Sequence, residues 1–119
     1  MLSNLMRHAA EVWRPSLTQA AGQEIDRYSL VSAGVPCFAQ PASASRIYAY
    51  QQVGVEIDTV IYTTATDEDF RQHDLLVVND RQFHVLAVKE ALLSSIYLEL
   101  ACVEFPQGAK RRLDKEDYE

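Results

Sequence analysis

The chain has 119 residues, a formal net charge of −6 and an ordinary hydrophobic fraction of 48%. This length suits one domain with one modest core, and the composition excludes wholesale disorder. The negative charge argues against gripping a nucleic-acid backbone, because that affinity comes from Lys and Arg side chains. No apolar run approaches the ~20 residues that cross a bilayer, and the first residues lack the pattern of a signal peptide. We therefore expect no membrane association and a cytosol-like compartment until assembly.

The first third of the chain predicts three short strands. A strand at 11–14 precedes a polar loop over 16–23. Strands at 25–31 and 35–40 follow, and Gly34 lies in the connection between them, where a glycine adopts turn conformations at little cost. The alternation of apolar and polar residues in these segments is typical of half-buried strands.

The segment 42–53 interrupts the strand pattern and predicts a short inserted helix or a long excursion. Ser43 suits the N-cap position of such a helix, because its hydroxyl accepts from a backbone N–H of the first turn. Gly54 suits the residue just after the last turn, where the backbone turns left-handed.

The side chains of this inserted helix predict an interface. Ala44, Ile47 and Tyr48 share one helical face, and Arg46 and Tyr50 point elsewhere. Tyr and Arg are favoured at interfaces because they bury a large area while keeping a polar tip. Tyr48 either packs into the protein's own core or joins that interface. The expected subunit or channel interface comprises Arg46, Ile47, Tyr48, Tyr50, Gln51 and Gln52.

The second half of the chain also predicts strands. A β-branched strand covers 55–63, and a hairpin joins 75–78 to 81–88. Asn79 and Asp80 form its turn, since both tolerate the positive φ angles of a tight two-residue corner. The return strand places three apolar side chains on one face, namely Phe83, Val85 and Ala87.

The clearest strand runs over 95–103. Its apolar face at period two consists of Ile96, Leu98, Leu100 and Cys102. From 106 onward the chain is charged and poor in apolar residues, so we expect a barrel domain over 1–105 and a charged tail over 106–119. The predicted fold is mainly β, a small antiparallel β-barrel of six to seven strands with one short inserted helix or loop and an extended C-terminal tail.

Metal and catalytic motifs are missing from the sequence. His8, His73 and His84 lack metal-site spacing, and the acidic stretch over 67–74 lacks the glycine of a calcium loop. Cys37 and Cys102 lie far apart and read as two buried thiols. The sequence has neither a nucleophile-elbow motif nor a phosphate-binding loop. We expect no catalytic residue, no metal and no cofactor, and hence no enzyme.

Six motifs follow one another in an order that resembles a known family. They are Trp13-Arg14-Pro15 with Gly22 and Tyr28, the strand 35–41 ending in Gln40-Pro41, the insertion 42–54, the strand 59–63, the hairpin from His73-Asp74 to Phe83-His84-Val85, and the final Cys102-Val103-Glu104. Over roughly 12–104 this order resembles the head–tail joining, or head-closure (stopper), family of tailed bacteriophages. The chain departs from that pattern at His73, where the family has Gly, and at Phe83, where Tyr is commoner.

The resemblance implies a β-barrel that forms a homo-oligomeric ring in the virion neck, between a portal-side adaptor protein and the tail. It implies that the inserted segment faces the channel, that genome DNA passes through without sequence-specific binding, and that assembly takes place in the host bacterial cytoplasm. An acidic subunit suits such a conduit because like charges repel. The charged tail would supply a further interface through Lys110, Arg111, Arg112 and Tyr118.

Two other functions remain open at the level of sequence. A tail-completion or tail-terminator subunit is also a small ring-forming protein. An oligonucleotide-binding barrel would bind single strands through Tyr48, Tyr50 and Arg46, because bases stack on aromatic rings. A small enzyme has no motif in its favour.

Overall fold

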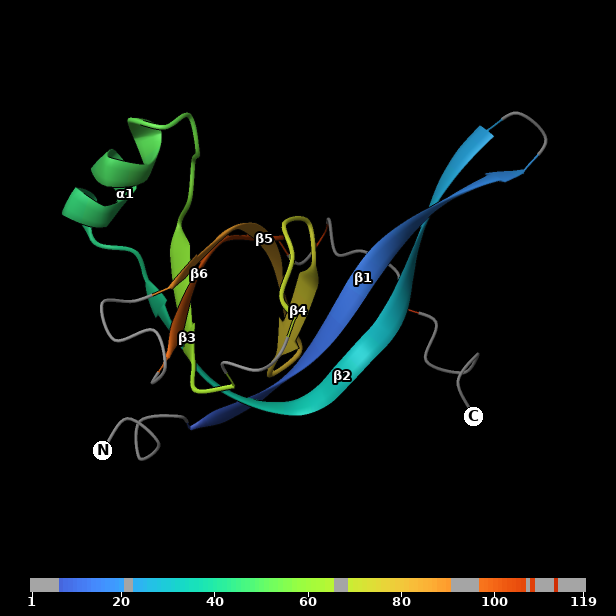
Figure 1. The fold of residues 1–119 in the computed structure, drawn as a ribbon, viewed down its shortest axis with the longest axis horizontal. Coiled ribbons are helices and arrows are strands. Elements are labelled where there is room, and N and C mark those ends of the chain that lie inside the picture. Colours follow the sequence, from blue (N-terminus) through green and yellow to red (C-terminus); the bar gives the residue numbers. More distant parts are fainter. Residues whose placement is uncertain are drawn as a thin grey trace.

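The computed structural model describes residues 7–20, 23–65, 69–90, 97–106, 108 and 113; for 16–20, 23–27 and 90 it describes the backbone alone. Within these residues the elements are β1 His8–Ala20, β2 Gln23–Pro41, α1 Ala44–Gln51, β3 Thr59–Thr63, β4 Leu75–Val78, β5 Arg81–Glu90 and β6 Leu98–Glu104. The strands close into a barrel in the order β1-β2-β3-β6-β5-β4, with antiparallel pairing throughout (Figure 1). The predicted mainly β barrel with one short inserted helix is confirmed.

The hairpin of β1 and β2 is longer than the sequence predicted. Most of the expected polar loop over 16–23 is paired strand, and the two strands expected at 25–31 and 35–40 are one continuous strand. Register shifts place extra residues in β2, and Gly34 adopts a φ of 68° beside one of them. Such bulges let a strand bend without ending, which explains why the glycine did not terminate β2. The far end of this hairpin projects from the barrel, on the side opposite α1 (Figure 1).

The core of the barrel consists of one cluster of buried side chains contributed by all six strands. In β6 it includes Leu98, Leu100 and Cys102, as the alternation predicted, while Ile96 lies outside the described residues. The whole cluster comprises Ala10, Val12, Val35, Cys37, Ile61, Phe70, Leu76, Val78, Phe83, Val85, Leu98, Leu100 and Cys102. Closure of the sheet shields these side chains and leaves no free strand edge in the barrel.

The hairpin of β4 and β5 turns where the sequence predicted. Asn79 and Asp80 have φ angles of 50° and 66°, the left-handed conformation of a tight two-residue turn. One expectation for β5 is wrong. A register shift between Val85 and Ala87 inserts one extra residue, so Ala87 packs outside the barrel and not with the inward side chains of β5.

Among the described residues, no helix has the length and apolar character needed to cross a membrane.

Candidate functional site

Helix α1 begins and ends close to the predicted positions. The Ser43 hydroxyl accepts a hydrogen bond of 3.2 Å from the backbone N–H of Arg46, which caps the first turn. Gly54 has a φ of 80°, the left-handed conformation that follows a helix at little cost only for glycine. The chain then reaches β3 at Thr59, so the strand predicted over 55–63 is shorter than expected.

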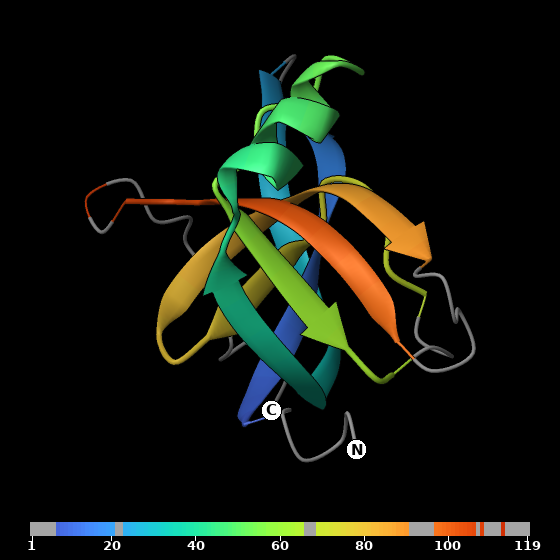
Figure 2. The same ribbon diagram turned by 90° about the vertical axis from the view of Figure 1, so that its left-hand side faces the viewer.

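The helix lies against the outer surface of the barrel. A second buried cluster, formed by Tyr50, Ile57, Val60 and Ala101, fills the space between α1 and strands β3 and β6. Figure 2, which faces this side of the molecule, shows α1 in front, with β3 and β6 below it. Both faces of β6 are therefore buried, one inside the barrel and one toward the helix. The helix is thus a fixed part of the domain.

A buried carboxylate ties α1 to β6. Glu99 is only 4% exposed, and its carboxylate accepts a hydrogen bond of 2.8 Å from the Tyr50 hydroxyl. Arg46 Nη1 lies 3.0 Å from Glu99 Oε1 and neutralises the carboxylate. Burial and the hydrogen bond to Glu99 raise the pKa of the Tyr50 hydroxyl, which therefore stays protonated and donates. We call Arg46, Tyr50 and Glu99 the helix latch.

The helix latch corrects the expected orientation of α1. The sequence placed Tyr50 away from the packed face, whereas its side chain is buried in the second cluster. Tyr48, for which core and interface were both open, is 64% exposed. Arg46, Ile47 and Tyr50 lie on the side of the helix that faces the barrel. Arg46 and Tyr50 face this way because both bind the Glu99 carboxylate beneath them.

The exposed side of α1 presents part of the predicted interface to solvent. Tyr48, Gln51 and Gln52 are exposed, and Val53 beside them is 73% exposed, which makes it one of the most exposed large apolar side chains described. We call Tyr48, Gln51, Gln52 and Val53 the α1 outer patch. The sequence missed Val53, although a valine just before a glycine stop was a visible signal.

The other predicted interface, in the charged tail, is not placed by the structure. Lys110, Arg111, Arg112 and Tyr118 lie outside the described residues. The acidic stretch is partly described, and there Asp74 is fully buried and bound to Arg14 through two contacts of 3.0 Å. This carboxylate therefore serves the packing of β1 against the chain before β4.

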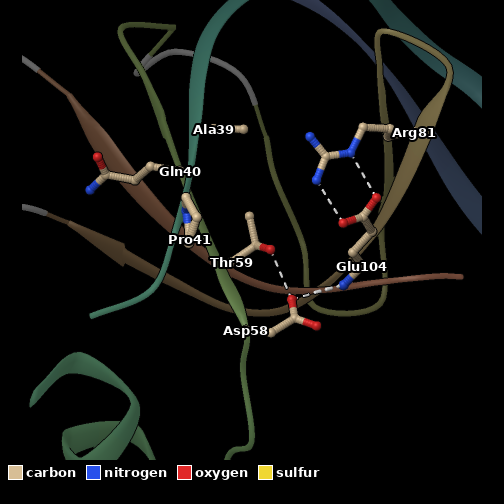
Figure 3. Close-up of a pocket in the computed structure, with 7 residues that line it drawn as sticks. All are labelled: Ala39, Gln40, Pro41, Asp58, Thr59, Arg81 and Glu104. Atoms are coloured by element: carbon tan, nitrogen blue, oxygen red, sulfur yellow. Dashed lines mark hydrogen bonds and ion pairs between the residues drawn. The ribbon is translucent and has the colours of Figure 1, made fainter. Parts of the chain in front are cut away.

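A pocket of about 330 Å³ lies where several strands of the barrel begin or end (Figure 3). Arg81 and Glu104 form a bidentate ion pair on one side of it, with both nitrogen–oxygen distances 2.7 Å (Figure 3). Asp58 accepts hydrogen bonds from the Thr59 hydroxyl and from the backbone N–H of Glu104. The hydrogen bonds to Glu104 raise the pKa of Arg81, so its guanidinium stays protonated. The lining consists of Ala39, Gln40, Pro41, Asp58, Thr59, Arg81 and Glu104.

This pocket was not foreseen, because its lining comes from the ends of β2, β3, β5 and β6 and from the connection before β3. Its charged groups join neighbouring strand ends and hold the rim of the barrel together. The carboxylates of the pocket accept hydrogen bonds from the chain itself, so these groups serve the structure of the barrel rim.

Both cysteines are buried in the barrel core as free thiols, as the sequence predicted. Burial raises the pKa of Cys37 to about 11 and raises that of Cys102 as well. A thiol held in its protonated form is a poor nucleophile and a poor metal ligand.

No protein-family model matches this sequence, and no curated protein matches it. Solved structures share the fold, including the following two. The solution structure of protein SF1141 from Shigella flexneri 2a has a TM-score of 0.68 at 12% identity, covering 90% of this chain and 99% of that one. The xkdH protein of the phage-like element PBSX from Bacillus subtilis has a TM-score of 0.52 at 12% identity, covering 82% and 92%. At this identity the likeness shows a common barrel fold.

Proposed function

We propose that this chain is a structural subunit of a tailed-phage particle, a head-closure protein that forms a ring in the neck between a portal-side adaptor and the tail. In this proposal the chain acts by assembly and performs no catalysis. The segment 42–54 lies toward the DNA channel, and the α1 outer patch contacts the next copy in the ring.

The observation that carries the proposal is the shared fold with xkdH, a protein of a phage-like element, over most of both chains. It supports the same class of protein as the order of the sequence motifs. A net charge of −6 agrees with a conduit that DNA slides through, because like charges keep the duplex from adhering to the wall.

The α1 outer patch supports the assembly role. Tyr48 and Val53 expose apolar area on a helix whose other side is fixed to the barrel by Glu99. A rigid, exposed Tyr beside an apolar side chain is typical of interface anchors, since little conformational freedom is lost when they are covered. The two glutamines beside them supply hydrogen-bonding groups for the rim of the same contact.

The geometry argues against an oligonucleotide-binding barrel. Two of the three residues assigned to that function, Tyr50 and Arg46, are committed to Glu99. A buried ring offers no face to a base, and an arginine paired with a carboxylate attracts phosphate weakly.

Assembly is tested with the whole chain and with the products of the genes that flank it. Sedimentation velocity over a range of concentrations, alone and with those products, reports a ring as a fast-sedimenting species. The double substitution Tyr48→Ser with Val53→Ser is expected to reduce that species at least tenfold while the thermal midpoint stays unchanged. Val31→Ser, at another exposed apolar side chain on β2, is the matched control.

A chain that stays monomeric in every mixture would refute the proposal. Association with a tail-tube protein, but not with a portal-side adaptor, would instead assign the chain to tail completion or tail termination. Assembly that is unaffected by the double substitution would remove the α1 outer patch from the interface.

A further inference from the structure

Two histidine rings face each other on the outside of the barrel. His73 Nδ1 lies 3.0 Å from His84 Nε2, and the ring centroids are 5.2 Å apart. His73 precedes β4 and His84 lies within β5, eleven positions later. The spacing gave no sign of this pair, because the turn at Asn79 and Asp80 is what folds the two positions together.

The backbone of His73 and the ring of His84 are held in place by their surroundings. The backbone N–H of His73 donates to Val85 at 2.7 Å, and Val85 donates back to Asp74 at 2.8 Å. Asp74 is in turn fixed by Arg14. The His84 ring stacks on Phe105 with an angle of 10° between the planes. Fixed ligands lower the entropy that a bound ion must overcome, so this pair is organised before any ion arrives.

The backbone at His73 adds a second observation. Its φ of 77° is a left-handed conformation that a glycine adopts without cost. Left-handed residues other than glycine point to a local constraint or a role for the side chain. Here the conformation directs an imidazole, the commonest metal-binding side chain, at a second imidazole.

The separation of the rings fits a metal ion between them. A tetrahedral zinc with zinc–nitrogen bonds of about 2.05 Å sets two bound nitrogens about 3.3 Å apart and their ring centroids about 5.2 Å apart. The observed nitrogens are closer than this, at 3.0 Å, and the observed centroid distance of 5.2 Å is also the one that the hydrogen bond between the two rings produces. Small ring rotations would aim both lone pairs at one point.

We propose that His73 and His84 form a two-imidazole binding site for a divalent transition-metal ion, with zinc as the reference ion. Imidazole nitrogens suit zinc, copper and nickel, whereas magnesium and calcium require oxygen ligands. Within the described residues no third His, Cys, Asp or Glu joins the pair. The site is independent of the proposed function, because a monomer presents both rings.

Binding requires one internal rearrangement. The ring that donates the hydrogen bond between the two histidines moves its proton to its other nitrogen by exchange with water. Both facing nitrogens then carry lone pairs, and the ion takes the place of the shared hydrogen.

Calorimetric titration of the full chain with zinc chloride, in protein purified without a histidine tag, tests the site. One zinc per chain is expected near neutral pH. Imidazole nitrogen resonances of His73 and His84 should shift with zinc and stay unchanged with magnesium. His73→Asn, which tolerates the left-handed backbone, and His84→Gln should each weaken zinc binding at least tenfold. His8→Gln is the control and should leave the affinity unchanged.

Absence of any heat or resonance shift up to about 1 mM zinc, the weakest affinity worth assigning, would overturn the proposal. Zinc binding that leaves both resonances unmoved, or that survives His84→Gln, would overturn it too. The resonances of the unmodified chain decide the matter even if a variant fails to fold.

Discussion

The Tyr50 hydroxyl and the Glu99 carboxylate, 49 positions apart, meet at 2.8 Å beneath helix α1. This contact, with the Arg46 ion pair beside it, fixes the helix to the barrel and decides which of its side chains remain outside. The same contact turns an apparent interface residue into a structural one. Substitutions at Tyr50 therefore report on the stability of the fold, and assembly has to be probed at Tyr48 and Val53.

Tyr50→Phe should lower the free energy of unfolding by about 1.5–3 kcal/mol, because a buried carboxylate loses a charge-assisted hydrogen bond while the ring packing is kept. Urea denaturation followed by circular dichroism measures the change. Tyr48→Phe makes the same substitution at an exposed tyrosine and should leave the free energy of unfolding unchanged. Equal stabilities for the two variants would show that the hydrogen bond contributes nothing.

Asp74→Ala should destabilise the fold by about 3–5 kcal/mol. The substitution removes the buried carboxylate and leaves the largely buried Arg14 guanidinium without this ion pair. It also removes the acceptor for the backbone N–H of Arg71. Asp69→Ala removes an exposed carboxylate that is paired with Arg71 and serves as the comparison. Thermal or urea unfolding should separate the two variants clearly, and similar midpoints would contradict the role assigned to Asp74.

The free energy of unfolding should fall as the pH rises from 9 to about 11, because both buried thiols, Cys37 and Cys102, have raised pKa values, and the part due to Cys37 can be isolated. Burial raises the pKa of the Cys37 thiol to about 11, so over that window the unfolded thiol ionises while the folded one keeps its proton. Ionisation then favours the unfolded state, at about 1.4 kcal/mol per pH unit for one such thiol. Below pH 9 neither state ionises and the contribution is flat.

Cys37→Ala provides the control for this pH dependence. Its unfolding free energy should decline less steeply than that of the unmodified chain between pH 9 and 11, whatever its absolute stability. Parallel curves would mean that Cys37 ionises equally well in both states.

Removing residues 106–119 should leave a folded barrel. Every residue of the two buried clusters lies before this segment, and Phe105, which stacks on His84, is retained. Circular dichroism and the thermal midpoint of the shortened chain should match those of the full chain within a few degrees. Insoluble or unfolded protein would make the segment part of the domain, against the boundary that its composition predicts.

The sequence alone determined the fold class and some of the places where the chain turns. Alternating side chains in β6, the Asn79-Asp80 corner and the Ser43 cap are local features, since each depends on a few adjacent residues. A prediction from such local features is wrong where the same residue type occurs in two different structures. Gly34 reads as a break between strands, yet within a paired sheet it serves as a bulge that lets β2 continue.

Tertiary structure decided everything that depends on which strands become neighbours. Barrel closure places Glu99 of β6 under α1, and that buried charge then selects Tyr50 as the inward tyrosine and leaves Tyr48 outside. The pairing of β4 with β5 likewise brings His73 to His84, although neither spacing nor composition connects them. The periodicity of a sequence shows which side of a helix or strand is apolar. Contacts between distant segments depend instead on the order of the strands in the sheet. A short helix with tyrosines on two sides is oriented only by the residues that it packs against.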